Sequence, residues 1–467
     1  MPDPRGDHEA DATESEIRSF ENPRRVAALV HAVGGPTAHT RQDRYMEAGG
    51  MVRAADVGRL IVLFMMMGLL PTPSVAQTPA APPAAGGAQP APATTREALI
   101  EREQAAKVPT LKPYAHGTVE RIFDKADAII EGGTLKWHPF FQSAYSGGGF
   151  TLGAGRAFFV SPYNLIDVRG SYTIKSYKRI EAEFIAPRLF DRRAKLSVLG
   201  GWREATQVGF FGVGTDSLLE DEANYLFKQP YGSALFTIFP TRRALMLRGG
   251  AEYTRWTQEA GEGGSPSVEE VYSTGTLPGL GAEVTYLHTQ ATVGFDWRPA
   301  PGYAKRGGFY GVTFHDFADQ DDEFGFKMIE YEAIQHVPIL RDTWVLSFRG
   351  RVQTTGDKDG EQTPFFMLPA LGGGSTLRGF NSWRFRDQNS LLLQAEWRVM
   401  INRYLDLALF YDAGTVAARR EDLDFDRLKD DFGVGVRFHG PFSTPLRVEL
   451  AKSHESLTLV FASTPSF

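Results

Sequence analysis

The segment "SLLLQAEWRVMINRYLDLALFYDAGTV", residues 390–416, alternates between apolar and polar side chains with a period of two. Successive side chains of a β-strand point to opposite faces, so this period indicates two strands joined by a short turn. One face carries Leu391, Leu393, Ala395, Trp397, Val399 and Ile401, then Leu405, Leu407, Leu409 and Tyr411. The other carries Gln394, Glu396 and Arg398, then Asp406, Ala408, Phe410, Asp412 and Gly414. An apolar face opposite a charged face is typical of strands that separate lipid from a polar lumen.

The same alternation recurs from residue 135 to about residue 463 in sixteen segments. Short connections such as "SPYN", "FDRR" and "INRY" alternate with longer ones such as "GTDSLLEDEANY". Short periplasmic turns that alternate with long outer loops are the signature of an outer-membrane barrel. The sequence therefore predicts an all-β fold, a transmembrane antiparallel β-barrel of about sixteen strands, over residues 135–467.

The N-terminal region contains one apolar run, "LIVLFMMMGLL" at residues 60–70. This run is shorter than the ~20 residues that a transmembrane helix needs. Arg53 and Arg59 precede it, and the small residues of "SVA" (74–76) suit a secretory cleavage site. We predict a signal peptide at residues 51–76, which exports the chain to the bacterial outer membrane, and we interpret the polar residues 1–50 as an over-called extension. The alternative is a soluble protein in which the run forms a short buried helix.

Between the signal peptide and the barrel we expect two further segments. Residues 77–96 are rich in proline, alanine and glycine and cannot bury a core, which predicts a disordered linker. Residues 97–134 contain two short amphipathic stretches, which predict a short periplasmic helical segment.

Composition excludes several classes of site. The chain has no cysteine, so neither disulfides nor thiol chemistry are available, and its net charge of −6 argues against nucleic acid as a partner. No Gly-x-Ser-x-Gly motif and no metal-ligand spacing occur. His439 and the "HES" at 454–456 lack the serine, histidine and asparagine pattern of a barrel phospholipase, and "DQDDE" (319–323) fits a solvated loop. We therefore expect no enzyme activity, no cofactor and no metal.

The segment "PALGGGSTLRGF", residues 369–380, is too rich in glycine for a regular strand and carries one arginine, Arg378. The next two predicted strands place Glu396 and Asp412 on the lumen face. A loop folded into the lumen could bring Arg378 to both carboxylates, where its planar guanidinium suits bidentate pairing. We predict that these three residues form a latch; a purely structural salt-bridge network is the alternative.

These motifs resemble the bacterial surface antigen superfamily, which includes BamA, TamA and the two-partner secretion transporters. The stretch "GGGSTLRGF" is similar to the inward loop of that family, with Gly372, Gly373, Gly374, Leu377, Gly379 and Phe380 around Arg378. The stretch "FYDAG" resembles the family's strand motif and supplies Phe410, Asp412 and Gly414, and "QAEWR" resembles the preceding strand with its glutamate. The resemblance implies a sixteen-stranded barrel in which the loop arginine contacts these acids.

The resemblance also implies a role in inserting or translocating outer-membrane proteins or lipids. The expected partners are outer-membrane lipids, lipopolysaccharide, and a client outer-membrane protein or a separate periplasmic partner. Family members usually carry periplasmic POTRA repeats, and the segment between Gln77 and the first strand is too short for one. A passive pore and a structural surface antigen remain as alternative functions.

Overall fold

The computed structural model describes residues 49–52, 100, 102, 105–107, 136–241 and 244–467. Its main feature is a 17-stranded antiparallel sheet, formed by the short strand β1 and sixteen strands that pair in chain order. These sixteen are β2 (Trp137–Pro139), β3 (Thr151–Phe159), β4 (Leu165–Thr173), β5 (Lys178–Arg188), β6 (Ala194–Phe210), β7 (Ala223–Ile238), β8 (Leu245–Ala260), β9 (Glu283–Asp296), β10 (Gly307–Asp319), β11 (Phe326–Leu340), β12 (Trp344–Asp357), β15 (Asn389–Asn402), β16 (Leu405–Ala417), β17 (Lys429–Phe438), β18 (Leu446–Ser453) and β19 (Leu457–Ala462).

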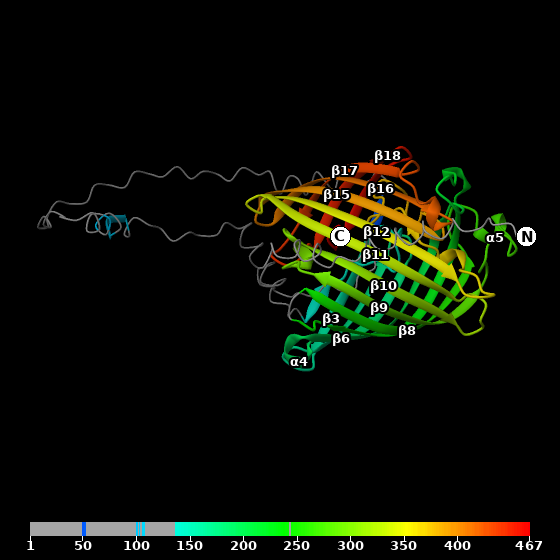
Figure 1. Ribbon diagram of the computed structural model, residues 1–467, viewed down its shortest axis with the longest axis horizontal. Coiled ribbons are helices and arrows are strands. Elements are labelled where there is room, and N and C mark those ends of the chain that lie inside the picture. The colour runs from blue at the N-terminus through cyan, green and yellow to red at the C-terminus, as the bar shows by residue number, and fades with distance from the viewer. Residues whose placement is uncertain (1–48, 53–99, 101, 103–104, 108–135, 242–243) are drawn as a thin grey trace, which may run out of the picture. The chain divides into compact units, whose positions relative to one another are not determined.

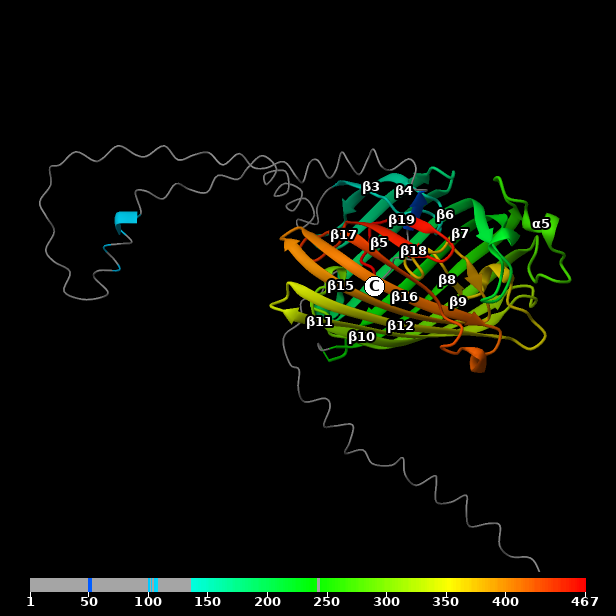
Figure 2. The ribbon, with the colours of Figure 1, turned by 90° about the horizontal axis from the view of Figure 1, so that it is seen from above.

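The sheet curls into a barrel whose strands run obliquely to its axis (Figures 1 and 2), and this confirms the predicted fold class. Connections at one end, the short-turn end, include α4 (Leu189–Arg192) and η4 (Pro301–Tyr303). Connections at the other, the long-loop end, include η3 (Leu219–Asp221), α5 (Val268–Val271) and η6 (Arg420–Asp422).

The strand faces follow the alternation of the sequence. On the pair β15 and β16, Gln394 lies opposite Asp412 and Glu396 lies opposite Phe410. Glu396 and Asp412 are only 2% and 0% exposed, whereas the outward Leu409 is 42% exposed. The polar face is therefore the inner one, because only the loops and side chains inside the barrel can cover it.

The chain between β2 and β3 does not continue along the edge of β3. Residues 140–149 are mostly buried, and their backbone and side chains contact inward-facing residues of β4, β5 and β7. The Tyr145 hydroxyl, for example, donates a hydrogen bond of 2.5 Å to Gln229 Oε1. The first strand of the barrel is therefore only three residues long, and the segment that follows it lies in the lumen.

Little of the N-terminal region is described. Strand β1 (Gly49–Val52) pairs with β19, and Ile100, Arg102 and residues 105–107 are helical. The rest of the predicted extension, signal peptide, linker and periplasmic segment lies outside the described residues, so these assignments stay predictions. Within the described residues, no helix has the length and apolar character needed to cross a membrane.

Candidate functional site

Residues 358–388, which connect β12 to β15, fold back into the barrel and form what we call the inward loop. It contains η5 (Phe365–Met367) and a small hairpin of β13 (Ala370–Leu371) and β14 (Phe385–Arg386). Most of its residues from Thr363 onward are buried. A loop of this length is covered in this way only because the barrel wall surrounds it.

Glycines shape the turn that leads to Arg378. Gly372 and Gly373 have φ of 111° and 103°, a region that residues with a Cβ rarely adopt. Gly379 lies so close to β17 that a Cβ there would be 2.6 Å from the Cβ of Asp431. The carbonyl of Gly374 accepts a hydrogen bond of 2.8 Å from Arg447. The predicted glycine positions therefore serve backbone turns and close approach to the wall.

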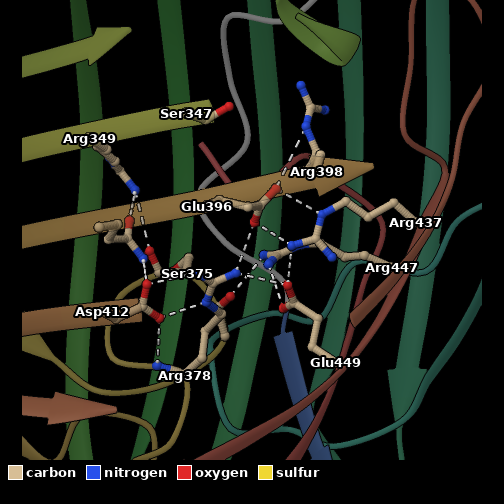
Figure 3. A network of polar contacts seen from close by, with 12 residues as sticks. Ser347, Arg349, Ser375, Arg378, Glu396, Arg398, Asp412, Arg437, Arg447 and Glu449 are labelled. Atoms are coloured by element: carbon tan, nitrogen blue, oxygen red, sulfur yellow. Dashed lines mark hydrogen bonds and ion pairs between the residues drawn. The ribbon is translucent and has the colours of Figure 1, made fainter. Parts of the chain in front are cut away.

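Arg378 meets both predicted carboxylates, as Figure 3 shows. Its Nε and Nη2 donate to the two oxygens of Asp412 at 2.6 and 2.7 Å, which is a bidentate pair. Its Nη1 donates to Glu396 at 3.3 Å. The planar guanidinium is thus shared between two neighbouring strands, β16 and β15, and this fixes its orientation.

A third carboxylate, Glu449 of β18, accepts a hydrogen bond of 2.8 Å from Arg378 Nη1. Arg437 of β17 contacts Glu396 and Glu449, and Arg447 donates to Glu449 at 2.7 Å. We call these residues the Arg378 network: Arg378, Arg437, Arg447, Glu396, Asp412 and Glu449. These three cations and three anions are each at most 2% exposed, and Arg398 lies 3.8 Å from Glu396 as a further cation.

Arg378 is completely buried. Burial by itself would lower the pKa of its guanidinium, but the charges of Asp412, Glu449 and Glu396 outweigh this effect and raise the pKa well above its usual value. The ring of Phe410 lies beneath the guanidinium, with its centroid 3.5 Å from Arg378 Cζ. The aromatic residue of the strand motif therefore adds a cation–π contact to the ion pairs.

Apolar residues of the loop pack around this network. Leu377 and Phe380 are fully buried in a cluster with Leu371, Phe385, Leu392 and Val416. Gly414 lets Leu371 approach β16, since a Cβ at this position would lie 2.8 Å from Leu371 Cδ1. The loop motif and the strand motif therefore meet, and each supplies one side of the contact.

The inward loop has a second attachment, to strands β6, β7 and β8, which we call the aromatic anchor. Phe365 packs edge-on against Phe210 and Tyr225, with ring centroids 5.1 Å apart in both pairs. Phe366 packs against Phe227 at 4.9 Å and against Trp256 at 6.3 Å. These partners belong to β6, β7 and β8, so the loop spans the lumen from these strands to β15–β18.

The loop also contacts both sides of the seam between β2 and β19. The carbonyl of Gly379 accepts hydrogen bonds from Ser453 at 2.8 Å and from Ser456 at 2.7 Å, both at the β18–β19 turn. Trp383 Nε1 donates to the carbonyl of Ser146, in the segment that follows β2, at 3.0 Å. One short stretch of loop thus bridges the first and last parts of the barrel.

The charged groups of the Arg378 network pair mainly with one another. Among the residues that the structure describes, no three His, Cys, Asp or Glu side chains are placed to hold a metal ion. The polar atoms of the Arg378 network are largely occupied by one another. Their exchange for other partners would free the loop without breaking a covalent bond.

The sequence motifs bring Arg378, Glu396 and Asp412 together, but they do not identify Glu449, Arg437 and Arg447 as members of the network. A signal was present, because Arg437 and Glu449 lie on the charged faces of their strands. That pattern says which face a residue occupies and not which residue it meets across the lumen. The aromatic anchor has no such signal, since Phe365 and Phe366 lie in an irregular loop.

Comparison with known proteins agrees with the barrel geometry. The profile of the Omp85 superfamily domain matches residues 164–456, which is more than half of the chain. No curated protein sequence matches the chain. The crystal structure of BamA from Haemophilus ducreyi lacking POTRA domains 1–3 is similar, with 15% identity, coverage of 70% of this chain and 69% of that one, and a TM-score of 0.51.

Two further structures are CdiB from Acinetobacter baumannii and CdiB from Escherichia coli, each 10% identical, with TM-scores of 0.43 and 0.45. The match with the first covers 67% of this chain and 55% of that one. The match with the second covers 70% of this chain and 61% of that one. At such identities the BamA likeness speaks for the fold alone, whereas the domain profile speaks for the family. The resemblance noted in the sequence is confirmed, and the chain belongs to the Omp85 superfamily of outer-membrane β-barrels.

Proposed function

We propose that this chain inserts or translocates protein or lipid at the outer membrane, and that its inward loop holds the seam between β2 and β19 closed. The family supports outer-membrane insertion or translocation in general. The observation that carries the finer proposal is the position of residues 379–383, which contact both sides of the seam.

The strands at the seam favour this role. Strand β2 contributes only three residues, and four of the six residues of β19, from Leu459 to Ala462, pair with β1, so β2 and β19 have few backbone groups left to hold one another. Backbone pairing therefore provides little of the closure, and contacts from inside the barrel provide a larger share. The Arg378 network then acts as the latch that keeps the loop in this position, and opening requires Arg378 to leave Asp412, Glu396 and Glu449.

The loop weighs against a passive pore, because it crosses the lumen from β6–β8 to β15–β18, where such a pore would be open. Membership of the family supports a non-enzymatic role, and the sequence has no Gly-x-Ser-x-Gly motif. A separate periplasmic partner that binds residues 97–132 fits this function, and its co-purification with the barrel would support it.

A reversible crosslink tests the proposal. The hydroxyls of Ser146 and Ser382 lie 3.1 Å apart, and the chain has no cysteine of its own. The double variant Ser146→Cys/Ser382→Cys should therefore form a disulfide that ties the loop to the first-strand segment. A photo-crosslinking residue in place of the outward-facing Leu457 of β19 reports clients at the seam in native outer membranes.

We expect crosslinks to client protein or lipid in the reduced state and their loss after oxidation, with recovery on reduction. The single cysteine variants should respond to neither treatment. Equal crosslinking in the oxidised and reduced states would contradict the proposal. A large, steady single-channel conductance in both states would instead favour the passive pore.

A further inference from the structure

The outer wall of β5 to β8 contains a shallow groove of about 630 Å³. Its floor is made by Ala182, Gly200 and Gly232, which face outward and lie directly opposite one another on neighbouring strands. Larger side chains form its rims, including Phe184 on one side and Tyr253 on the other. Nothing in the described chain fills the space above Gly232, where an added Cβ would meet no atom within 4 Å.

The turn below this groove, between β5 and β6, has an unusual backbone. Phe190, Asp191 and Arg192 have φ of 49°, 55° and 68°, three successive left-handed residues of which none is glycine. Such conformations are unfavourable, persist only when the surroundings impose them, and cluster at binding sites. The turn holds the Phe190 ring outward, 71% exposed, with its edge against Phe236.

The same turn carries positive charge. Arg188, Arg192 and Arg193 are exposed, and Asp191 is the one carboxylate between them. The guanidinium of Arg188 lies 4.2 Å from the ring centroid of the exposed Tyr163. Within the described part of the chain, neither Arg192 nor Arg193 has an ion-pair partner. Arginines beside exposed aromatic rings match the headgroup level of a membrane, where both phosphate and apolar contacts are available.

The depth of the groove fits a lipid that is held at this turn. Gly200 lies seven residues beyond Arg193 in the chain, which is roughly 23 Å at the usual rise of a strand. Because barrel strands are tilted and the apolar band is about 25 Å tall, the groove lies within the hydrocarbon layer while the arginines reach its edge. Basic headgroup contacts and an apolar channel are therefore arranged one above the other.

We propose that this wall binds an anionic phospholipid of the leaflet that faces the short turns. Arg192 and Arg193 hold its phosphate, the rings of Phe190 and Tyr163 lie beside its glycerol region, and one acyl chain fills the groove over Gly200 and Gly232. An acidic protein would also be attracted by the arginines, but it would leave the groove in the apolar wall unused. Charge complementarity and the groove together favour the lipid.

The test uses the full chain in vesicles with a single fluorophore, attached through Gly232→Cys in the groove. Quenching is measured with spin-labelled phosphatidylglycerol and, separately, with spin-labelled phosphatidylcholine. A matched label through Val434→Cys, on the outward face of β17 between Leu409 and Leu450, reports ordinary annular lipid. We expect preferential quenching by phosphatidylglycerol at the groove and equal quenching by the two lipids at the control position.

Substitutions then separate headgroup from groove. Arg192→Glu/Arg193→Glu should abolish the preference, since each basic residue near a membrane surface contributes about a fivefold enrichment. Arg419→Glu/Arg420→Glu at the long-loop end should leave it unchanged. Gly200→Leu should reduce quenching at the groove by filling it. Equal quenching by both lipids in the parent protein, or a preference that survives loss of Arg192 and Arg193, would overturn the proposal.

Discussion

The two attachments of the inward loop differ in their physics. The Arg378 network holds the loop to β15–β18 by directed ion pairs, in which each charge depends on several others. The aromatic anchor holds it to β6–β8 by ring packing, which has little directional demand. Removal of one ring loses buried area, whereas removal of one charge leaves its partners buried without compensation. One substitution should therefore disrupt the Arg378 network as a whole, whereas one substitution in the aromatic anchor should weaken that attachment only in part.

The largest effect is expected for Arg378→Ala. This change removes one cation from the buried carboxylates Asp412, Glu396 and Glu449. Breaking a buried ion pair lowers the free energy of unfolding by about 3–5 kcal/mol. The temperature of the gel shift between folded and unfolded barrel should fall, and single-channel current should fluctuate more as the loop moves. Unchanged heat-modifiability would show that the network does not hold the loop.

Two control variants sharpen this prediction. Arg378→Lys keeps the charge but loses the planar fork, so it should recover only part of the lost stability. Arg419→Ala removes an arginine whose side chain is 69% exposed and whose ion pairs lie in solvent. Its removal should leave the gel-shift temperature unchanged, because solvent screens exposed ion pairs.

A smaller effect is expected for Phe365→Leu in the aromatic anchor. Leucine keeps most of the apolar volume, so the loss comes mainly from the edge-on contacts with Phe210 and Tyr225. Such contacts contribute about 0.5–1.5 kcal/mol each, which predicts a loss of roughly 1–3 kcal/mol in a denaturant titration. A loss as large as that of Arg378→Ala would mean that the two attachments are equally abrupt.

The smallest effect is the coupling between the two attachments. Arg378 and Phe365 share no contact partner among the interactions described above, so their effects on the free energy of unfolding should add within about 0.5 kcal/mol. The double variant Arg378→Ala/Phe365→Leu measures this coupling. A strongly non-additive result would show that the loop leaves the wall as one unit and that the distinction between the attachments does not hold.

Much of this molecule is readable from side-chain alternation. The faces of β15 and β16, the strand number and the alternation of short and long connections follow from the period of two, because a strand offers only two directions to its side chains. The pairing of Arg378 with Glu396 and Asp412 could be predicted, because the motifs of the loop and of the two strands that follow it resemble those of one family. The inward path of residues 140–149 could not be predicted. Local side-chain alternation does not show whether a segment stays paired with the next strand or turns into the lumen.

The sequence by itself determined which residues face inward, and it determined that Arg378 lies in a glycine-rich loop. Only the tertiary structure decided what those residues meet. Glu449 lies 71 residues beyond Arg378, and Phe210 lies 155 residues before Phe365. The curvature of the sheet and the left-handed turn at Gly372 and Gly373 bring them together. Local patterns fix the direction of a side chain, whereas its partner across the lumen depends on the path of every strand between them.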